Sequence, residues 1–254
     1  MLLDFDGTLS PIVADPAAAR PLPGAIPALQ ELAGRYALVG VLSGRPVEFL
    51  TALLPPEIVV SGLYGLEVVR DGVRVDHPYA GAWREVIEDV ARASASRGPT
   101  GMQVEPKGLS LTLHFRAHPE LADAVHDWAL TQAWRSGLEV RPARMSIELH
   151  PPIATDKGTA LEALCEGLDA VCYVGDDVGD LPAFDALDRM AEAGTAHTVR
   201  VAVSSDEAPP ELLDRADLVL EGPDEVLGFL RSLLGGGELL SQPVGGTTGL
   251  NELP

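Results

Sequence analysis

The sequence predicts an α/β protein with a doubly wound parallel sheet, interrupted by a smaller α+β unit. Before residue 78 and after residue 152, short apolar runs alternate with amphipathic segments, as in parallel βαβ units. Between residues 102 and 150, apolar and polar residues alternate with a period of two, which predicts antiparallel strands. We therefore expect a core domain of residues 1–78 and 152–235, and an inserted cap domain of residues 79–151.

The core elements follow from apolar periodicity and from turn residues. The expected helices cover 24–34, 46–54, 181–193 and 223–234, and another begins at 156 with Leu161, Leu164 and Leu168 on one face. The expected strands cover 1–3, 36–42, 58–60, 171–174, 199–203 and 218–220. The carboxyl ends of parallel strands in such a sheet open onto one crevice, where ligands bind.

The middle segment repeats an αββ unit twice. Helical stripes at 83–90 and 121–128 are each followed by two alternating stretches, which predicts a four-stranded sheet with both helices on its apolar face. The opposite face carries the hydrogen-bonding side chains Glu105, Lys107, His114, Arg116 and Glu148. A solvated face is the simpler interpretation of any one of them, whereas together they could recognise a polyhydroxylated ligand.

Composition excludes several classes of partner. A net charge of −20 over 254 residues argues against binding to nucleic acid or to anionic membranes. An anionic substrate would need local positive groups or a metal ion. Cys165 and Cys172 lie in apolar patterns and are expected to be buried thiols of a cytoplasmic protein, for which a monomer is favoured. No apolar run reaches membrane-spanning length, and the Gly-, Ser- and Thr-rich stretch 236–254 is expected to be flexible.

The first candidate site is the stretch 4–8, Asp-Phe-Asp-Gly-Thr, which follows the apolar residues 1–3. Asp4 and Asp6 would lie at the carboxyl end of a buried strand, where two neighbouring anions repel each other unless a cation or a proton lies between them. This arrangement indicates a hard metal ion with oxygen ligands, and acid/base or nucleophilic chemistry on an anionic substrate. A solvated turn is the alternative, since Asp and Gly are common turn residues.

Three more polar groups fall at strand ends or helix starts: Ser-Gly-Arg at 43–45, Asp-Lys-Gly at 156–158, and Gly-Asp-Asp-Val-Gly-Asp at 175–180. Each has a simpler interpretation. Ser43 could cap the following helix, Lys157 could be solvated, and Asp177 and Asp180 could be ordinary acids at a helix start. In a doubly wound sheet, however, all three groups converge with Asp4 on one crevice.

These four groups, in this order, resemble the four motifs of haloacid-dehalogenase (HAD)-type phosphatases. The stretches 62–67, 104–107, 114–116 and 148–151 narrow the resemblance to the trehalose-6-phosphate phosphatase family, over about residues 1–235. The family often has histidine where Tyr64 stands and threonine where Gly179 stands. Only three residues precede Asp4, so the natural start is expected upstream.

The resemblance implies a Mg²⁺-dependent phosphatase that hydrolyses trehalose 6-phosphate. Asp4 would be the nucleophile and would form an aspartyl-phosphate, and Asp6 would be the general acid and base. Asp4, the main-chain carbonyl of Asp6 and Asp176 would bind Mg²⁺, with Asp177 and Asp180 orienting waters and Lys157. Ser43 and Lys157 would hold the phosphoryl group. The other expected substrate contacts are Phe5, Thr8, Gly44 and Arg45 in the core, and Glu105, Lys107, His114, Arg116 and Glu148 in the cap.

Other functions are compatible with parts of this pattern. The same chemistry could act on sucrose 6-phosphate or mannosyl-3-phosphoglycerate, and the scaffold could serve as a non-catalytic sugar-phosphate sensor. A sensor needs no nucleophile, yet every residue of the catalytic set is present. Phosphoryl transfer through a P-loop is excluded because the sequence contains no G-x-x-x-x-G-K-[ST] pattern.

Overall fold

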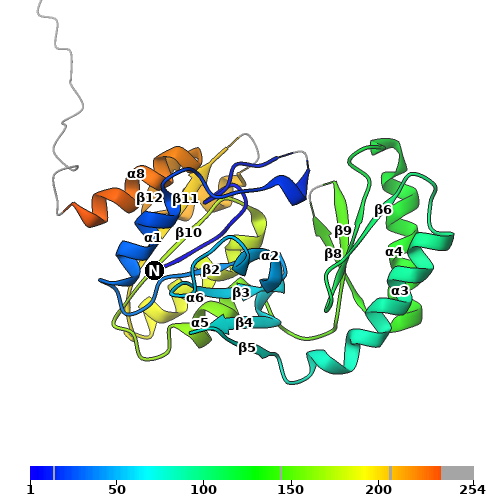
Figure 1. Ribbon diagram of the computed structural model, residues 1–254, viewed down its shortest axis with the longest axis horizontal. Coiled ribbons are helices and arrows are strands. Elements are labelled where there is room, and N and C mark those ends of the chain that lie inside the picture. Colours follow the sequence, from blue (N-terminus) through cyan, green and yellow to red (C-terminus); the bar gives the residue numbers. More distant parts are fainter. Residues whose placement is uncertain (14, 144, 206–207, 236–254) are drawn as a thin grey trace, which may run out of the picture.

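The structure, a computed structural model, describes residues 1–13, 15–143, 145–205 and 208–235, which form two β-sheets (Figure 1). The larger sheet has the strand order β12-β11-β10-β1-β2-β3-β4-β5, and the smaller one has the order β6-β7-β9-β8. The chain forms the smaller sheet between β5 and β10. The predicted fold class, an α/β core with an inserted α+β unit, is confirmed.

The elements of the larger sheet and its helices alternate along the chain. The strands are β1 (Leu2–Leu3), β2 (Gly40–Leu42), β3 (Val59–Gly62), β4 (Glu67–Arg70), β5 (Val73–Asp76), β10 (Ala170–Gly175), β11 (His197–Ser204) and β12 (Leu218–Glu221). The helices are α1 (Ala25–Ala33), α2 (Val47–Thr51), α5 (Lys157–Leu164), α6 (Leu181–Glu192), α7 (Pro210–Arg215) and α8 (Gly222–Leu234).

Strand β1 lies at the centre of the parallel part of the sheet. Leu3 is opposite Val41 of β2 and Val174 of β10, so Asp4 emerges between the ends of these two strands. Helices cover both faces: Leu3 packs in the cluster of α1, α2 and α8, whereas Leu2 packs in the cluster of α5 and α6. Because successive strand residues point to opposite faces, both faces are buried, as the doubly wound prediction requires.

The larger sheet also contains an antiparallel part, which the sequence analysis did not predict. Strands β4 and β5 form an antiparallel hairpin at its edge, joined through Asp71 and Gly72 at φ 52° and 74°. An Asp-Gly pair favours a two-residue hairpin turn with positive φ at both positions. Helix α2 is shorter than predicted, α7 was not predicted, and Leu168 lies beyond the end of α5.

The inserted unit has the predicted αββ-αββ order. It consists of α3 (Arg84–Arg97), β6 (Gln103–Pro106), β7 (Leu111–His114), α4 (Ala122–Ser136), β8 (Glu139–Ala143) and β9 (Ser146–His150). All its strand pairs are antiparallel, and Leu111, Leu113 and Leu149 are buried with residues of α3 and α4. Figure 1 shows the two helices on the outer side of the sheet, away from the core.

The polar face of the smaller sheet is not a simple solvated face. Ser110, Thr112, Glu148 and His150 are all buried, although their alternation with apolar residues predicted an outward direction. A buried face of this kind needs hydrogen-bond partners.

The remaining predictions concern the tail, the thiols and membranes. The stretch 236–254, predicted to be flexible, lies outside the described residues. Cys165 is buried as predicted, Cys172 is only partly buried, and both are free thiols. Within the described ranges, every helix is too short or too polar to cross a bilayer.

Candidate active site

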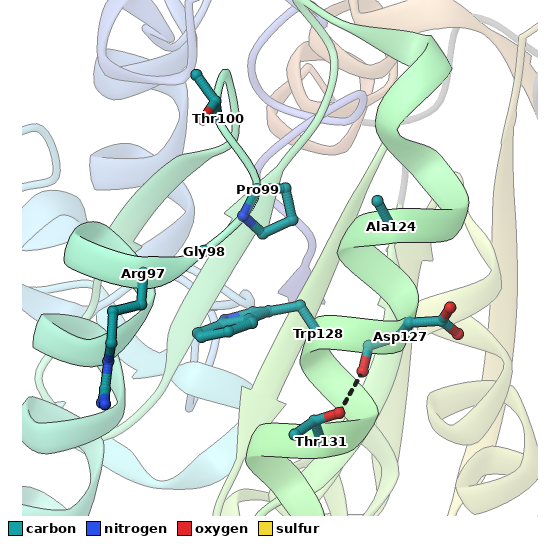
Figure 2. Close-up of a pocket in the computed structure, with 8 residues that line it drawn as sticks. All are labelled: Arg97, Gly98, Pro99, Thr100, Ala124, Asp127, Trp128 and Thr131. Atoms are coloured by element: carbon teal, nitrogen blue, oxygen red, sulfur yellow. Dashed lines mark hydrogen bonds between the residues drawn. The ribbon is translucent and has the colours of Figure 1, made fainter.

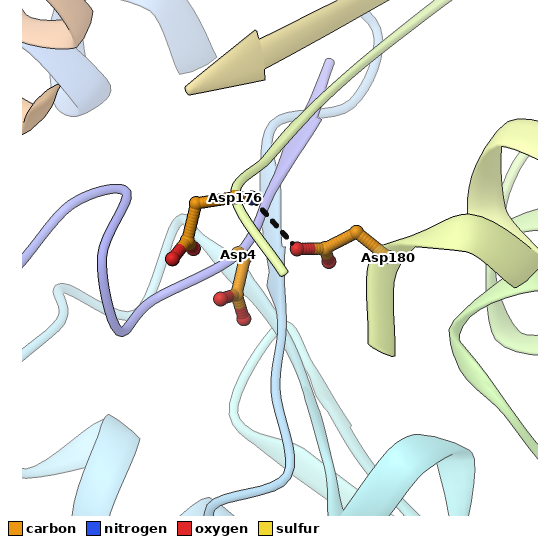
Figure 3. A group of neighbouring side chains, drawn as sticks. All are labelled: Asp4, Asp176 and Asp180. Atoms are coloured by element: carbon orange, nitrogen blue, oxygen red, sulfur yellow. Dashed lines mark hydrogen bonds between the residues drawn. The ribbon is translucent and has the colours of Figure 1, made fainter. Parts of the chain in front are cut away.

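Three carboxylates meet at the carboxyl ends of β1 and β10. Asp4, Asp176 and Asp180 each place one oxygen within 4.8 Å of the others, and all three are buried. Figure 3 shows Asp4 and Asp176 directed to the same side of the strand ends, with Asp180 reaching in from the start of α6. Residues far apart in sequence thus form one acidic cluster.

Lys157 enters this cluster from the first turn of α5. The carboxylate of Asp156 caps the helix by accepting from the amide of Thr159 at 2.7 Å, which fixes where the helix begins. The ammonium Nζ of Lys157 lies 2.8 Å from Oδ1 of Asp4 and 2.6 Å from Oδ1 of Asp180. Burial opposes the charge, but Asp180 and Asp4 raise the pKa of Lys157 well above its usual range. A fixed cation therefore lies beside Asp4.

Asp180 organises the cluster, because both its oxygens are occupied. Its Oδ1 accepts from Lys157 and from the hydroxyl of Tyr173 at 2.5 Å, and its Oδ2 accepts from the amides of Asp176 and Asp177 at 2.8 and 3.0 Å. The prediction that Asp180 orients Lys157 agrees with this geometry. Tyr173 was missed by the sequence analysis; the one available signal was a hydroxyl in a buried strand, since such groups need partners.

The charges of the cluster do not balance. Three carboxylates face one ammonium, so two negative charges are in excess when all are ionised. Burial is the main cause that raises the pKa of Asp4 well above its usual range and the pKa of Asp176 to about 8. Because Asp180 is fully bonded, Asp4 and Asp176 are left to bind a cation. Buried carboxylate oxygens with surplus charge fit a hard divalent ion.

The turn after β1 is shaped around Asp176. The hydroxyl of Thr8 donates to Oδ1 of Asp176 at 3.2 Å and helps to position this acid. The expected contact of Thr8 with a substrate stays a prediction. A Cβ atom on Gly7, which has φ +79°, would lie 2.0 Å from Oδ2 of Asp176, so only glycine fits there. Phe5 packs edge-on against Phe49 in the core, with ring centroids 5.9 Å apart, so its side chain is fully buried.

Asp6 does not join the carboxylate cluster, because Arg45 holds both its oxygens. The Nε and Nη2 atoms of Arg45 lie 2.6 and 2.7 Å from Oδ2 and Oδ1 of Asp6. The guanidinium also donates to the carbonyl of Pro16 at 2.8 Å and lies 4.2 Å from the ring centroid of Phe49. Arg45 therefore contacts Asp6, and its expected contact with a substrate stays a prediction. The expected metal contact of Asp6 involves its main-chain carbonyl, which this pairing leaves unaffected.

Ser43 follows β2, directly beside the end of β1. Its side chain is buried, and its oxygen accepts from the amide of Arg45 at 3.2 Å. Helix α2 is capped at Pro46 without a side-chain bond, so the interpretation of Ser43 as the cap of this helix is wrong. Asp177 accepts from the amide of Gly179 at 2.8 Å, and so stabilises its own turn.

The polar residues of the smaller sheet lie over this end of the core. Lys107 donates from Nζ to the carbonyl of Gly44 at 3.4 Å and lies 3.6 Å from Oε2 of Glu148. Glu105 bonds the imidazole Nε2 of His114 at 2.7 Å, and this bond lowers the pKa of Glu105. Arg116, beyond the end of β7, is exposed. The smaller sheet thus meets the Ser43–Arg45 loop through Lys107.

A hollow that contains none of these acids lies between the end of α3 and α4 (Figure 2). It has a volume of about 490 Å³ and is lined by Arg97, Pro99, Asp127, Trp128 and Thr131, among others. Figure 2 shows Trp128 extending from α4 toward the segment of Arg97 and Pro99, and the carboxylate of Asp127 pointing to the opposite side. The hollow contains neither an acidic cluster nor a buried cation, so the candidate site is the one at the strand ends.

Fold and site together define the HAD class of proteins: a doubly wound sheet, a carboxylate cluster at its strand ends and an inserted cap. A solved haloacid dehalogenase-like hydrolase from Bacteroides thetaiotaomicron has this fold, with a TM-score of 0.58 and 16% identity over 91% of this chain and 98% of that one. A solved trehalose-6-phosphate phosphatase related protein has a TM-score of 0.78 and 22% identity over 92% and 97% of the two chains. At these identities the likeness concerns the fold.

The chain belongs to the trehalose-phosphatase family, whose sequence model matches residues 2–214. This confirms the resemblance found in the sequence. The trehalose-phosphate phosphatase of Mycobacterium ulcerans is 34% identical over 241 residues, which cover 90% of this chain and 60% of the mycobacterial protein. The chain therefore spans about three fifths of the length of the curated relatives that it matches.

Proposed function

We propose that this chain is a Mg²⁺-dependent phosphatase that hydrolyses trehalose 6-phosphate to trehalose and phosphate. The observation that carries the proposal is the buried carboxylate of Asp4, with the ammonium of Lys157 at 2.8 Å and Asp176 in the same cluster. Family membership and the names of the relatives support the substrate. The reaction would release free trehalose as a late step of its biosynthesis, in the cytoplasm.

The proposed reaction has two steps that share one carboxylate. In the first, an oxygen of Asp4 attacks phosphorus, the bond from phosphorus to the sugar oxygen breaks, and Asp6 gives a proton to that oxygen. In the second, water attacks phosphorus, Asp6 takes its proton, and the bond from phosphorus to the Asp4 oxygen breaks, which regenerates the carboxylate and releases inorganic phosphate. Asp6 can act only after Arg45 frees one of its oxygens, so substrate binding must loosen this pair.

Electrostatic stabilisation of the transferring group is the second requirement. Lys157 supplies a fixed positive charge beside Asp4, and Ser43 lies at the end of the neighbouring strand, where its hydroxyl can donate to a phosphoryl oxygen. Asp4, Asp176 and the main-chain carbonyl of Asp6 would hold Mg²⁺. When bound, this ion supplies positive charge to the phosphoryl oxygens and cancels the surplus charge of the acids.

We assign recognition of the sugar to the cap domain, residues 79–151. The core domain comprises residues 1–78 and 152–235. Glu105, Lys107 and Glu148 face the catalytic end of the core, and His114 holds Glu105 in place. Carboxylates and an ammonium group on a fixed sheet suit the many hydroxyls of a disaccharide.

A panel of phosphate esters tests this function. Purified protein with Mg²⁺ is offered trehalose 6-phosphate, sucrose 6-phosphate, mannosyl-3-phosphoglycerate and p-nitrophenyl phosphate, and phosphate release is measured. We expect the highest kcat/KM for trehalose 6-phosphate. Equal activity on all the sugar phosphates, or preference for another one, would refute the assigned substrate.

A further inference from the structure

Tyr64 lies in a strained turn that is hydrogen-bonded to the Ser43–Arg45 loop, here called the catalytic loop. It belongs to the short helix η2 (Leu63–Gly65) and has the left-handed angles φ 58° and ψ 35°, which a bulky residue seldom adopts. Its amide donates to the carbonyl of Ser43 at 3.1 Å, and the amide of Leu63 donates to the carbonyl of Arg45 at 3.0 Å. Strain that is held in this way often marks a functional position.

The ring of Tyr64 covers Gly44. A Cβ atom on Gly44 would lie 2.6 Å from both Cζ and the hydroxyl oxygen of Tyr64, so no side chain fits at position 44 with this ring in place. Gly44 is also the residue whose carbonyl accepts from Lys107 of the cap. The hydroxyl end of Tyr64 is therefore placed where the catalytic loop meets the cap.

The same ring contacts the cap directly. The guanidinium carbon of Arg141, in β8, lies 5.9 Å from its centroid, and the ring of His150, in β9, lies 6.4 Å away at 65°. These are the separations of a cation–π contact and of an edge-to-face aromatic pair. Tyr64 is thus a core residue that joins two cap strands.

Unsatisfied polar atoms surround this junction. Within the described ranges, Oε1 of Glu148, Nε2 of His150 and Oγ1 of Thr112 are buried without hydrogen-bond partners. The Tyr64 side chain makes ring contacts there, but its hydroxyl has no partner among the described residues. Burial and the charge of Glu148 raise the pKa of Tyr64, so the hydroxyl keeps its proton and can donate. Buried groups without partners are completed by a ligand or by water.

We propose that Tyr64 is a specificity-determining residue. Its hydroxyl donates a hydrogen bond to one hydroxyl of the sugar, and the same sugar hydroxyl donates to the carboxylate of Glu148. The inference rests on the proposed function, because it assumes a sugar phosphate with its phosphoryl group at Asp4. A tyrosine where the family often has histidine brings a hydroxyl to the border of core and cap. A small aryl phosphate offers no hydroxyl there and does not use Tyr64.

The variant Tyr64→Phe tests this role, because it keeps the ring and removes only the hydroxyl. The matched control is Tyr36→Phe, which changes a tyrosine that is 41% exposed on the core. KM and kcat are measured for trehalose 6-phosphate and for p-nitrophenyl phosphate. We expect the KM for the sugar phosphate to rise about tenfold in Tyr64→Phe, as for the loss of one hydrogen bond. The aryl phosphate should change by less than about twofold. Equal changes for both substrates would overturn the inference.

A binding experiment separates this inference from the proposed reaction. In an Asp4→Asn background, which holds substrate without turnover, the affinity for each sugar phosphate of the panel is measured by calorimetry with and without Tyr64→Phe. If another sugar phosphate binds best, the assigned substrate is wrong, yet a tenfold loss of its affinity in Tyr64→Phe still supports the role of Tyr64. Unchanged affinity for the ligand that binds best, or no binding of any sugar phosphate, overturns it.

Discussion

The acidic cluster of the core and the polar face of the cap differ in how far their hydrogen bonds are satisfied. In the core, Asp180 accepts four hydrogen bonds, Lys157 bridges two acids, and Thr8 holds Asp176. In the cap, buried oxygens of Glu148 and Thr112 have no partner among the described residues. The acidic cluster of the core therefore has its hydrogen bonds in place without a ligand, whereas the polar face of the cap leaves buried atoms unpaired.

This difference follows from what each region would bind. Every phosphate ester presents the same phosphoryl group, so fixed charges can be built once and kept in place. The leaving group varies between substrates, and a face with open donors and acceptors favours the ligand that completes them, because unpaired buried groups are costly. We infer that chemistry resides in the core and discrimination in the cap.

Removal of the buried cation in the core should reduce both stability and turnover, whichever substrate is used. Lys157→Met leaves the carboxylates of Asp4 and Asp180 without their ammonium partner. The expected costs are about 3–5 kcal/mol of unfolding free energy and a loss of turnover of about 10³-fold on every substrate. The control Arg189→Met removes an exposed pair with Glu162 and should cost less than about 1 kcal/mol. Urea unfolding and steady-state kinetics check both. A Lys157→Met protein as stable as Arg189→Met would contradict the account.

Removal of the cap cation should instead reduce turnover of the sugar phosphate much more than turnover of a small aryl phosphate. Lys107→Met removes the contacts with Gly44 and Glu148 but retains an apolar stem of similar length. The kcat/KM for trehalose 6-phosphate should fall about 10- to 100-fold, the range for one or two lost polar contacts. Turnover of p-nitrophenyl phosphate should change by less than about threefold. Arg97→Met, at an exposed position in α3, is the control. Equal losses on both substrates would show that the cap face does not recognise the sugar.

Tyr173→Phe tests the network behind the acids. The phenol donates to Asp180 at 2.5 Å, and a hydrogen bond to a charged group contributes about 1.5–3 kcal/mol. We expect a loss of stability in this range, together with reduced turnover of sugar and aryl phosphates alike. Tyr36→Phe should leave both properties unchanged. A Tyr173→Phe protein with normal stability and normal activity would show that Asp180 needs no phenol.

The effect of Mg²⁺ on stability should depend on pH. Burial raises the pKa of Asp176 to about 8, above its value near 4 in an unfolded chain. Between these values the metal-free folded chain binds more protons than the unfolded chain, so its stability falls as pH rises through this window. Because the ion competes with this proton, added Mg²⁺ should stabilise the protein more at pH 8 than at pH 6, by about 1 kcal/mol. Melting curves with Mg²⁺ or with chelator test the sign. Greater stabilisation at pH 6 would contradict it.

The part of the site that depends on the main chain could be predicted from sequence. Asp4, Ser43 and Asp176 follow neighbouring parallel strands, so their convergence follows from topology. Most pairings between side chains could not be predicted from spacing, and the pairing of Asp180 with Lys157 was expected only from the resemblance. The unexpected pairs are Arg45 with Asp6, Thr8 with Asp176, and Tyr173 with Asp180. They depend on side-chain rotamers and on the paths of loops. These are set by the folded surroundings and not by sequence spacing.

The core fold was predictable for the same reason, and the edge hairpin that the sequence analysis missed could also have been predicted. Apolar periodicity located most helices and strands, but the hairpin of β4 and β5 was overlooked although Asp71 and Gly72 separate two valine-rich runs. The polar alternation of the cap predicted the strands correctly. Which polar residues are covered depends on how the cap meets the core, and that contact joins segments distant in sequence.

The most direct test compares wild-type protein with Asp4→Asn, a nearly isosteric change that removes the nucleophilic oxygen. Phosphate release is measured with Mg²⁺ from trehalose 6-phosphate and from p-nitrophenyl phosphate, and circular dichroism verifies the fold. We predict that wild-type protein hydrolyses both and that Asp4→Asn loses activity on both by about 10⁴-fold or more. Turnover by Asp4→Asn at the wild-type rate would show that this carboxylate does not accept the phosphoryl group.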